Sequence, residues 1–168
     1  MRACWSSTLL GASRVVGAVR SSKLEAVSRT RLPYDQLVDS QNLVTALANE
    51  KFDVIIDPVG GALRKQSFAV MKPGSRLIAV GNASGDWASE VKTNDLWLGS
   101  VTVAGFNAGA YLPSHGEAVR AGLDAGLRAV AAGLLDTPID LLSFAEASLA
   151  HARMESRALD GRIVLTPT

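Results

Sequence analysis

Short apolar runs alternate along the chain with longer stretches in which apolar residues recur every three or four positions. The short runs predict buried strands, and the periodic stretches predict helices. Strands are expected at Arg14 to Val19, around Gln36 to Asp39, at Phe52 to Asp57, at Arg76 to Gly81 and at Val101 to Phe106. Helices are expected at Ser22 to Arg29, at Asn42 to Glu50 and at Ala62 to Met71, the last ended by Lys72-Pro73-Gly74. This alternation is typical of a parallel sheet with helices on both faces.

The last third of the chain predicts two more helices and a strand. From Glu117 to Leu134 one face is apolar and the other carries neighbouring opposite charges, which predicts an amphipathic helix packed on a sheet. Ser143 and Glu146 have the spacing of a capping box, and the helix they open runs toward Arg157, before a final strand at Arg162 to Thr166. The whole pattern predicts an α/β fold with a doubly wound, Rossmann-like parallel sheet, which binds ligands beyond the strand carboxyl ends. A flavodoxin-like or methyltransferase-like sheet has similar periodicity and is the alternative.

Composition narrows the class of protein. The chain has 168 residues, of which 48% are hydrophobic and 20% charged, and a formal net charge of +1, as in one soluble domain. We therefore expect neither a nucleic acid nor a membrane as partner. Cys4, His115 and His151 are the only cysteine and histidines of the sequence, so we expect no disulfide, no metal site and a cytoplasmic protein. Residues 1–10 are too short for a signal-peptide core or a membrane span.

A cationic turn, Arg20-Ser21-Ser22-Lys23, follows the first predicted strand. Where a strand end meets the adenosine ribose of a dinucleotide, an acidic side chain binds a free 2′-hydroxyl, whereas a cationic one pairs with a 2′-phosphate. The serines add hydroxyl donors, Arg20 can make a forked contact, and Lys23 adds charge near a helix amino terminus. The turn therefore favours NADP over NAD. A solvated turn with an ordinary serine cap is the alternative.

Small residues follow two further predicted strands. Asp57-Pro58-Val59-Gly60-Gly61 predicts a sharp turn into a helix with close backbone approach, as at the lip of a nucleotide cleft. Capping of that turn is the alternative role for Asp57. After the next strand, Gly81-Asn82-Ala83-Ser84-Gly85 leaves main-chain amides and carbonyls free to face a flat ring, which is what holding a nicotinamide requires.

Five segments resemble, in order and at matching separations, the nucleotide-binding half of zinc-independent, quinone oxidoreductase-like members of the medium-chain dehydrogenase/reductase superfamily. They are RVVGAVRSSK, FDVIIDPVGG, PGSRLIAVGNASG, VTVAGFNAGAYL and DGRIVLTP. The resemblance implies an NADP-dependent oxidoreductase that transfers a hydride to a quinone or conjugated carbonyl, and a homodimer formed through the strand Val101 to Phe106. It also implies cofactor contacts at Ser21, Ser22 and Lys23 for the 2′-phosphate, Val59 and Gly60 for the adenine and ribose, and Gly81, Asn82, Ala83, Ser84, Phe106 and Asn107 for the nicotinamide.

The chain departs from the family pattern near its amino end. Family members carry an upstream substrate domain, then a first strand and a glycine-rich loop that cradles the pyrophosphate, and the sequence contains none of these. Since the missing strand is the central one, we expect a gap between the strand at Arg14 and the strand at Phe52. Either a rearranged or partner-donated strand fills the gap, or the chain is a fragment. Residues 1–136 would be an incomplete dinucleotide-binding domain, and residues 137–168 a strand-helix-strand segment that in the family returns to the substrate domain.

No residue is assigned as a proton donor. Tyr111, His115 and Asn107 lie near the appropriate loop, but a surface turn is the expected role of His115. Ser40 stands near the position where many relatives have a tyrosine after the third strand, and the offset of Tyr34 makes it a poor substitute.

Three functions follow from these observations. An oxidoreductase that is active when its substrate domain is present is the leading interpretation. The alternative is a truncated, non-catalytic paralogue that acts as a dimerisation or weak nucleotide-binding module. A methyltransferase-like binder is disfavoured, because it would prefer an acidic residue over the cationic turn after its second strand.

Overall fold

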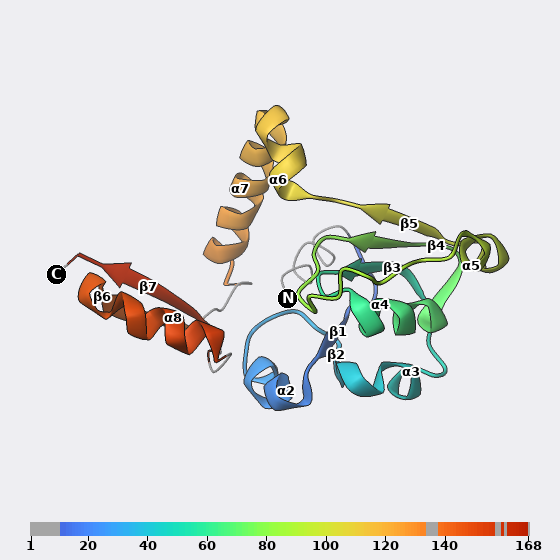
Figure 1. The fold of residues 1–168 in the computed structure, drawn as a ribbon, viewed down its shortest axis with the longest axis horizontal. Coiled ribbons are helices and arrows are strands. Elements are labelled where there is room, and N and C mark those ends of the chain that lie inside the picture. Colours follow the sequence, from blue (N-terminus) through green and yellow to red (C-terminus); the bar gives the residue numbers. More distant parts are fainter. Residues whose placement is uncertain (1–10, 134–137, 157–158, 160, 168) are drawn as a thin grey trace.

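The fold alternates strands and helices as the sequence pattern predicts. A computed structural model of the protein describes residues 11–133, 138–156, 159 and 161–167 (Figure 1). The strands are β1 (Val16–Val19), β2 (Gln36–Asp39), β3 (Phe52–Asp57), β4 (Met71–Ala79), β5 (Thr102–Gly105), β6 (Ile139–Ser143) and β7 (Arg162–Thr166). The helices are α2 (Ser21–Ser28), α3 (Leu43–Ala46), α4 (Gly61–Ser67), α5 (Thr93–Gly99), α6 (Ala108–Tyr111), α7 (Gly116–Ala131) and α8 (Ala147–Glu155).

Strands β1 and β2 form a two-stranded parallel sheet, in which Val16 pairs with Gln36 and Val19 with Asp39. Strand β1 begins two residues after its predicted start at Arg14. The Arg14 guanidinium instead forms an ion pair with Glu50, at 2.6 Å. Helix α2 follows β1 directly, so the chain turns at the carboxyl end of this strand.

Strands β3, β4 and β5 form a second parallel sheet with β4 in the middle. Residues Arg76 to Ala79 pair with β3 on one side and with β5 on the other. Strand β4 begins earlier than predicted, because Met71 already pairs with Phe52. The register shifts after this pair, so Lys72-Pro73-Gly74 lie in an irregular part of the strand. The preceding helix has ended by then, in a 3₁₀ turn at Phe68–Val70.

The two sheets share one hydrophobic core but are not hydrogen-bonded to each other in the part of the chain that the structure describes. The core consists of buried Val38, Leu43, Leu47 and Val70, against which Val16, Ala18, Phe52, Ile55 and Leu63 pack. Strands β1 and β3 therefore contribute to the same core from different sheets. This arrangement confirms the gap that the sequence predicted between these two strands.

The helix expected over Asn42 to Glu50 is much shorter than predicted. A 3₁₀ turn at Ser40–Asn42 comes first, and its amino-terminal cap is Asp39, whose carboxylate accepts the Gln41 amide at 3.0 Å. Helix α3 then covers one turn only. Its β-branched Val44 and Thr45 lose side-chain freedom in a helix, so the local sequence favours a longer helix only weakly.

Helix α7 forms where the periodicity predicts it, but the prediction that it packs on a sheet is wrong. Leu123, Leu127 and Val130 lie on its apolar face, and each is between 56% and 67% exposed. Figure 1 shows α7 beyond the end of the β3–β4–β5 sheet, following α6. The periodicity identifies an apolar face, whereas the partner that would cover this face cannot be read from it. No helix among the described residues, α7 included, is long and apolar enough to cross a membrane.

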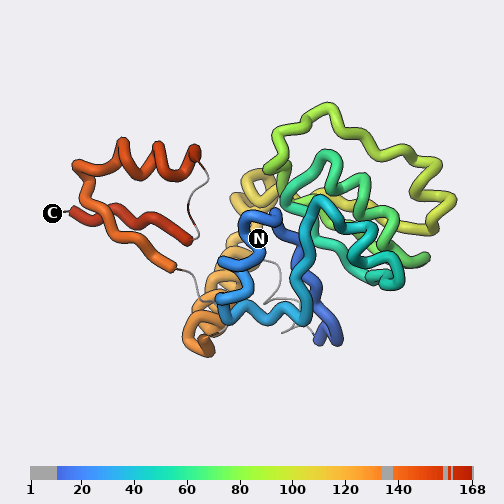
Figure 2. The backbone as a smooth tube through the Cα atoms, turned by 90° about the horizontal axis from the view of Figure 1, so that it is seen from below, coloured from blue at the N-terminus to red at the C-terminus, as the bar shows by residue number. Residues whose placement is uncertain are grey.

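Strands β6 and β7 with helix α8 form a strand-helix-strand unit. All five residues of β6 pair in register with β7, and both views show the unit to one side of the remaining described chain (Figures 1 and 2). The capping box is confirmed, since both of its reciprocal hydrogen bonds between Ser143 and Glu146 are present. The final strand is confirmed at Arg162–Thr166, and Arg157, toward which the helix was expected to run, lies outside the described residues.

Leu77, in the middle of β4, is expected to be a main determinant of stability because its side chain is fully buried. Leu77→Ala should lower the free energy of unfolding by about 2 to 5 kcal/mol, since it removes buried methyl groups and leaves a cavity. Leu98→Ala is the matched control, because Leu98 is 74% exposed, and it should cost about 0.5 kcal/mol or less. Urea denaturation measures both. Equal costs for the two variants would contradict the position of Leu77 in the core.

Glu146 is expected to make stability depend on acid pH. Hydrogen bonds from the Ser143 amide and then from its hydroxyl lower the pKa of Glu146 below its ordinary value. The capping interaction is therefore fully present above the ordinary glutamate pKa and is lost as pH falls through the lowered one. NMR titration of the Glu146 carboxyl should show that Ser143→Ala raises this pKa only partly, since the backbone amide remains. An unchanged pKa in the variant would show that the hydroxyl contributes nothing.

Candidate functional site

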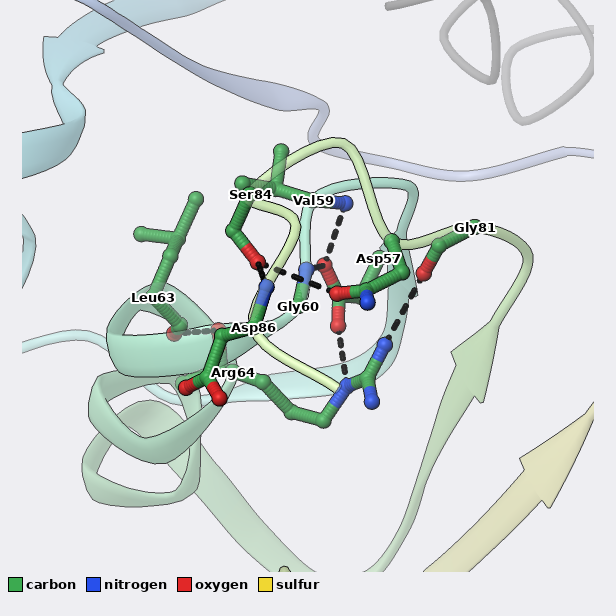
Figure 3. Close-up of polar contacts among 10 residues, drawn as sticks. Asp57, Val59, Gly60, Leu63, Arg64, Gly81, Ser84 and Asp86 are labelled. Carbon is green, nitrogen blue, oxygen red and sulfur yellow. Dashed lines mark hydrogen bonds and ion pairs between the residues drawn. The ribbon is translucent and has the colours of Figure 1, made fainter. Parts of the chain in front are cut away.

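Two loops meet where β3 and β4 end, and we call residues 57–61 and 80–86 the paired loops. The Val80 amide donates to the Asp57 carbonyl at 2.9 Å, which continues the pairing of the strands. Beyond it, the amides of Ala83 and Ser84 donate to the carbonyls of Pro58 and Val59 at 3.1 and 2.8 Å. The paired loops thereby bring together six of the predicted cofactor residues: Val59, Gly60, Gly81, Asn82, Ala83 and Ser84. Figure 3 labels four of them, Val59, Gly60, Gly81 and Ser84.

Asp57 is a buried carboxylate at the base of the paired loops, 4% exposed. Its Oδ1 accepts the amides of Val59 and Gly60 at 2.8 and 2.9 Å, so the turn-capping role weighed for this residue is present. Its Oδ2 accepts Nε of Arg64 at 2.5 Å. Nη2 of the same arginine donates to the Gly81 carbonyl at 3.0 Å, in the other loop. Figure 3 shows this series of bonds running from one loop to the other.

The glycines of the paired loops allow the loops to approach each other. A Cβ on Gly60, where φ is +77°, would lie 2.4 Å from Oδ1 of Asn82. A Cβ on Gly81 would lie 2.8 Å from the carbonyl oxygen of Pro58. The sequence interpretation assigned these small residues to close approach of a nucleotide. In the structure they are already required by the packing of one loop on the other.

The expected nicotinamide loop, Gly81 to Ser84, is held in place by hydrogen bonds within the paired loops. Its amides at Ala83 and Ser84 donate within the paired loops, and the Ser84 hydroxyl donates to Oδ1 of Asn82 at 3.0 Å. The expectation that the main-chain groups here are free to face a flat ring does not hold for these two amides. The reason is that a loop folded against its neighbour satisfies its own backbone donors. Ala83 and Ser84 are nevertheless exposed to solvent.

The exit of β5 is the third segment at this edge of the sheet. The Phe106 amide donates to the Ala79 carbonyl at 2.9 Å, so the chain leaves β5 alongside the end of β4. Asn107 then begins α6, with its Oδ1 accepting the Ala110 amide at 3.2 Å. Phe106 and Asn107, both predicted nicotinamide contacts, are therefore next to the strand that leads into Gly81.

An aromatic cluster follows this exit. The rings of Tyr111 and His115 stack with centroids 3.7 Å apart and 8° between their planes, and the Phe106 ring lies 5.5 Å from that of Tyr111. Nδ1 of His115 is 2.7 Å from the Tyr111 carbonyl. Since a carbonyl oxygen only accepts, Nδ1 is the donor in this contact. His115 thus lies in a surface turn, as expected, and also belongs to an aromatic stack that the sequence did not indicate.

The cationic turn Arg20-Ser21-Ser22-Lys23 lies at the carboxyl end of β1, where α2 begins. Arg20 is the amino-terminal cap residue and makes no side-chain capping bond, so the serine cap of the alternative interpretation is not present, although the turn is solvated as that alternative expects. Arg20, Ser21 and Ser22 are exposed. Nζ of Lys23 donates to the Leu159 carbonyl at 3.2 Å, so this lysine contacts the carboxyl-terminal part of the chain. The turn belongs to the β1–β2 sheet, whereas the paired loops belong to the other sheet.

Tyr34 does not lie at the carboxyl edge of the strands. A Cβ on Gly17 would lie 2.8 Å from the Tyr34 ring, so the ring packs across the middle of β1. Ser40 begins the 3₁₀ turn after β2. The offset of Tyr34 from the family position is therefore real, and the ring does not take the place of the expected stacking contact.

Two cavities lie away from the predicted cofactor residues. The larger, of about 530 Å³, is lined by Lys65, Phe68, Met71, Ala88, Glu90, Val91, Lys92, Asp95, Gly99 and Val101. A smaller one, of about 330 Å³, lies along β2 and the segment before it, from Val27 to Leu37. None of the predicted cofactor residues lines either cavity. These residues instead lie at or just after the carboxyl ends of β1, β3, β4 and β5.

Arg64 is the residue of this site that the sequence interpretation missed. It lies seven residues after Asp57, in the last turn of the short helix α4. An arginine in a helix has many possible roles at the surface. Only its contacts with the Asp57 carboxylate and with the Gly81 carbonyl, which is distant in sequence, identify it as part of the site. Among the described residues, no group of three or more His, Cys, Asp or Glu side chains could hold a metal ion.

These elements define a Rossmann-like, doubly wound nucleotide-binding fold. Residues 32–165 match the zinc-binding dehydrogenase family, and the chain belongs to that family. The cluster of His, Cys, Asp or Glu ligands that a zinc ion needs is not found among the described residues.

Known proteins that the chain resembles agree with this fold. A mycobacterial quinone oxidoreductase superposes with a TM-score of 0.80 at 21% identity, over 98% of this chain and 52% of that one. Escherichia coli quinone oxidoreductase complexed with NADPH gives 0.77 at 23%, over 98% and 52%. The synaptic vesicle membrane protein VAT-1 homolog of Danio rerio is 27% identical over 171 residues, 90% of this chain and 35% of that protein. The chain spans about half the length of these relatives or less, and the resemblance to the nucleotide-binding part of medium-chain dehydrogenases/reductases is confirmed.

Gly60→Ala is expected to disrupt the paired loops specifically. Both Gly60 and Gly74 have positive φ, but a Cβ on Gly74 has no atom within 4 Å, whereas one on Gly60 would overlap Asn82. Gly74→Ala therefore measures backbone strain alone, and Gly60→Ala should cost about 1 to 3 kcal/mol more in the free energy of unfolding. Urea denaturation compares the two variants. A Gly60→Ala cost no greater than that of Gly74→Ala would contradict the close contact between the loops.

Proposed function

We propose that this chain is the nucleotide-binding part of an NADPH-dependent oxidoreductase that reduces a quinone or a conjugated carbonyl compound. The observation that carries the proposal is the meeting of the paired loops and the β5 exit at the carboxyl edge of one parallel sheet. Doubly wound folds bind nucleotides at this edge. Membership in a dehydrogenase family supports oxidoreductase chemistry.

The cationic turn supports NADPH over NADH. A 2′-phosphate carries negative charge that Arg20 and Lys23 would pair with, and the exposed Ser21 and Ser22 at the start of α2 add donors. No acidic side chain occupies the turn to bind a free ribose hydroxyl. One relative of the same fold is a quinone oxidoreductase complexed with NADPH.

The proposed part of this chain in the reaction is to hold and orient the cofactor. When bound, NADPH supplies a hydride to the substrate. Asn82 and Ser84 offer polar groups after β4, and the half-exposed Phe106 ring offers an apolar surface after the neighbouring strand β5. Such a pair of surfaces suits the amide and the flat ring of a nicotinamide. We assign no proton transfer to these residues.

We also propose that the chain forms a homodimer through β5, in a cytoplasmic protein. Strand β5 is the outer strand of its sheet in the described chain, and Thr102, Ala104 and Gly105 are exposed. An uncovered edge strand exposes backbone donors and acceptors that need cover. The segment from Val101 to Phe106 would provide the contact between the two subunits.

The second candidate function is a non-catalytic dimerisation or weak nucleotide-binding module. Two observations favour it. The described β1–β2 sheet is not hydrogen-bonded to the other sheet, so the described strands form no continuous sheet of the kind that cradles a pyrophosphate. The apolar face of α7 is also uncovered by the described residues.

Titration of the purified chain with NADPH and NADH distinguishes the candidates, and we expect NADPH to bind more tightly. Lys23→Gln should weaken NADPH binding about tenfold and leave NADH binding unchanged, because it removes one charge-assisted contact to the 2′-phosphate. Lys51→Gln is the matched control, since the Lys51 ammonium also donates to a main-chain carbonyl, that of Ala69, but lies at the amino end of β3.

Fluorescence of the bound dihydronicotinamide or isothermal calorimetry measures these affinities. A preference for NADH would refute the role of the cationic turn. If neither cofactor binds at millimolar concentration, the non-catalytic module is the better description.

A further inference from the structure

We propose that Arg64 is a positioning residue for the cofactor, because its guanidinium locks the two paired loops into one rigid unit. This inference rests on the proposed function, since it assigns the order of the loops to cofactor binding. Neither the family match nor the sequence pattern identifies this residue. It is identified by the two hydrogen bonds that its side chain makes, one to Asp57 and one to Gly81.

Arg64 contacts both loops with separate nitrogen atoms. Nε donates to Oδ2 of Asp57 at 2.5 Å, and Nη2 donates to the carbonyl of Gly81 at 3.0 Å. The side chain is 16% exposed, and that of Asp57 is 4% exposed, so water competes little for the bond between them. The bond to the Gly81 carbonyl is exposed. One planar group therefore spans from the end of β3 to the end of β4 (Figure 3).

We call the Arg64 guanidinium with its bonds to Asp57 and Gly81 the bridge. Its position matters, because predicted cofactor residues lie in both of the loops that it joins. Asp57, through its other oxygen, fixes the amides of Val59 and Gly60. A Cβ on Gly60 would lie 3.3 Å from Nη2 of Arg64, so the guanidinium also packs against the adenine-side loop. Gly81 opens the nicotinamide-side loop. A shift of Arg64 would thus displace the two halves of the proposed cofactor surface relative to each other.

Charge gives the bridge a second effect. Asp57 is a buried carboxylate next to a surface that is proposed to bind an anionic dinucleotide. Arg64 supplies the compensating positive charge at 2.5 Å. Without it, the carboxylate would be buried and unpaired, and it would repel the phosphates of the ligand.

Lysine cannot replace this arginine. An ammonium is a point charge at the end of a flexible stem, whereas the guanidinium presents several donors in a fixed plane. In an Arg64→Lys variant the ion pair with Asp57 can form, but the simultaneous bond to the Gly81 carbonyl is lost. The variant therefore separates charge compensation from the joining of the loops.

Amide hydrogen exchange, followed by NMR on the chain without ligand, tests the joining directly. In Arg64→Lys the amides of Ala83 and Ser84, which donate across the paired loops, should exchange about tenfold faster than in the unsubstituted chain. Arg153→Lys is the matched control, because Arg153 forms an ion pair with Asp140 at 2.6 Å in the β6–α8–β7 unit. It should leave both amides unchanged.

A double variant keeps the test informative if loss of the arginine alone prevents folding. Asp57→Asn with Arg64→Met removes both charges together, while the asparagine oxygen still accepts the Val59 and Gly60 amides. Faster exchange at Ala83 and Ser84 is again expected. Asp140→Asn with Arg153→Met is its control.

NADPH affinity, measured on the same variants by isothermal calorimetry, supplies the second measurement. We expect Arg64→Lys to bind NADPH about tenfold more weakly than the unsubstituted chain, with the Arg153→Lys affinity unchanged. If Arg64→Lys and the unsubstituted chain bind NADPH equally tightly, the inference about Arg64 is overturned and the proposed function is not. Absence of NADPH binding by the unsubstituted chain would instead overturn the proposed function. Unchanged exchange at both amides overturns the inference whatever the affinities are.

Discussion

The buried carboxylate of Asp57 is the interaction on which the candidate site depends. A carboxylate at the end of an apolar strand is costly to bury unless donors surround it. Here two backbone amides and one guanidinium do so. Each of these donors comes from a segment that must then stay in place: the turn after β3 and the last turn of α4. Through its second nitrogen, Arg64 also holds the exit of β4. The same carboxylate therefore caps a turn, orients a helix and fixes the distance between two loops.

The division of the strands into separate sheets shows how far side chains can replace backbone pairing. Strands β1 and β3 are not hydrogen-bonded to each other in the described chain, yet Ala18 and Ile55 pack on the same core as Val38 and Leu43. Burial of apolar area is not directional, so it can hold these strands against one core, whereas hydrogen bonding requires an adjacent edge. The arrangement of helices and strands is thus kept even though the sheet is not continuous, which is why the superposition on complete relatives covers 98% of the chain.

The sequence predicted the features that depend on local pattern and missed those that depend on distant contacts. Strand β3 and the capping box follow from apolar runs and a three-residue spacing, and both appear where expected. Arg64 could not be found this way, since its partner Gly81 is 17 residues away in the chain. The periodicity of α7 likewise identified an apolar face correctly but carried no information about what covers it. The small residues of the paired loops were recognised, but the reason for them was assigned to a ligand, when contact between the loops already requires it.

The hydrogen bond of Lys23 links the cationic turn to the carboxyl-terminal part of the chain. This lysine donates to the carbonyl of Leu159, so the segment between α8 and β7 contacts the turn that is proposed to bind a 2′-phosphate. A neutral carbonyl competes poorly with a phosphate for an ammonium, because the hydrogen bond to a charged acceptor is stronger. If the proposed 2′-phosphate binds at this turn, it would be the stronger acceptor for the Lys23 ammonium. The segment before β7 and the β1–β2 sheet are in this way joined at the cationic turn. The paired loops are fixed separately, by Asp57 and Arg64.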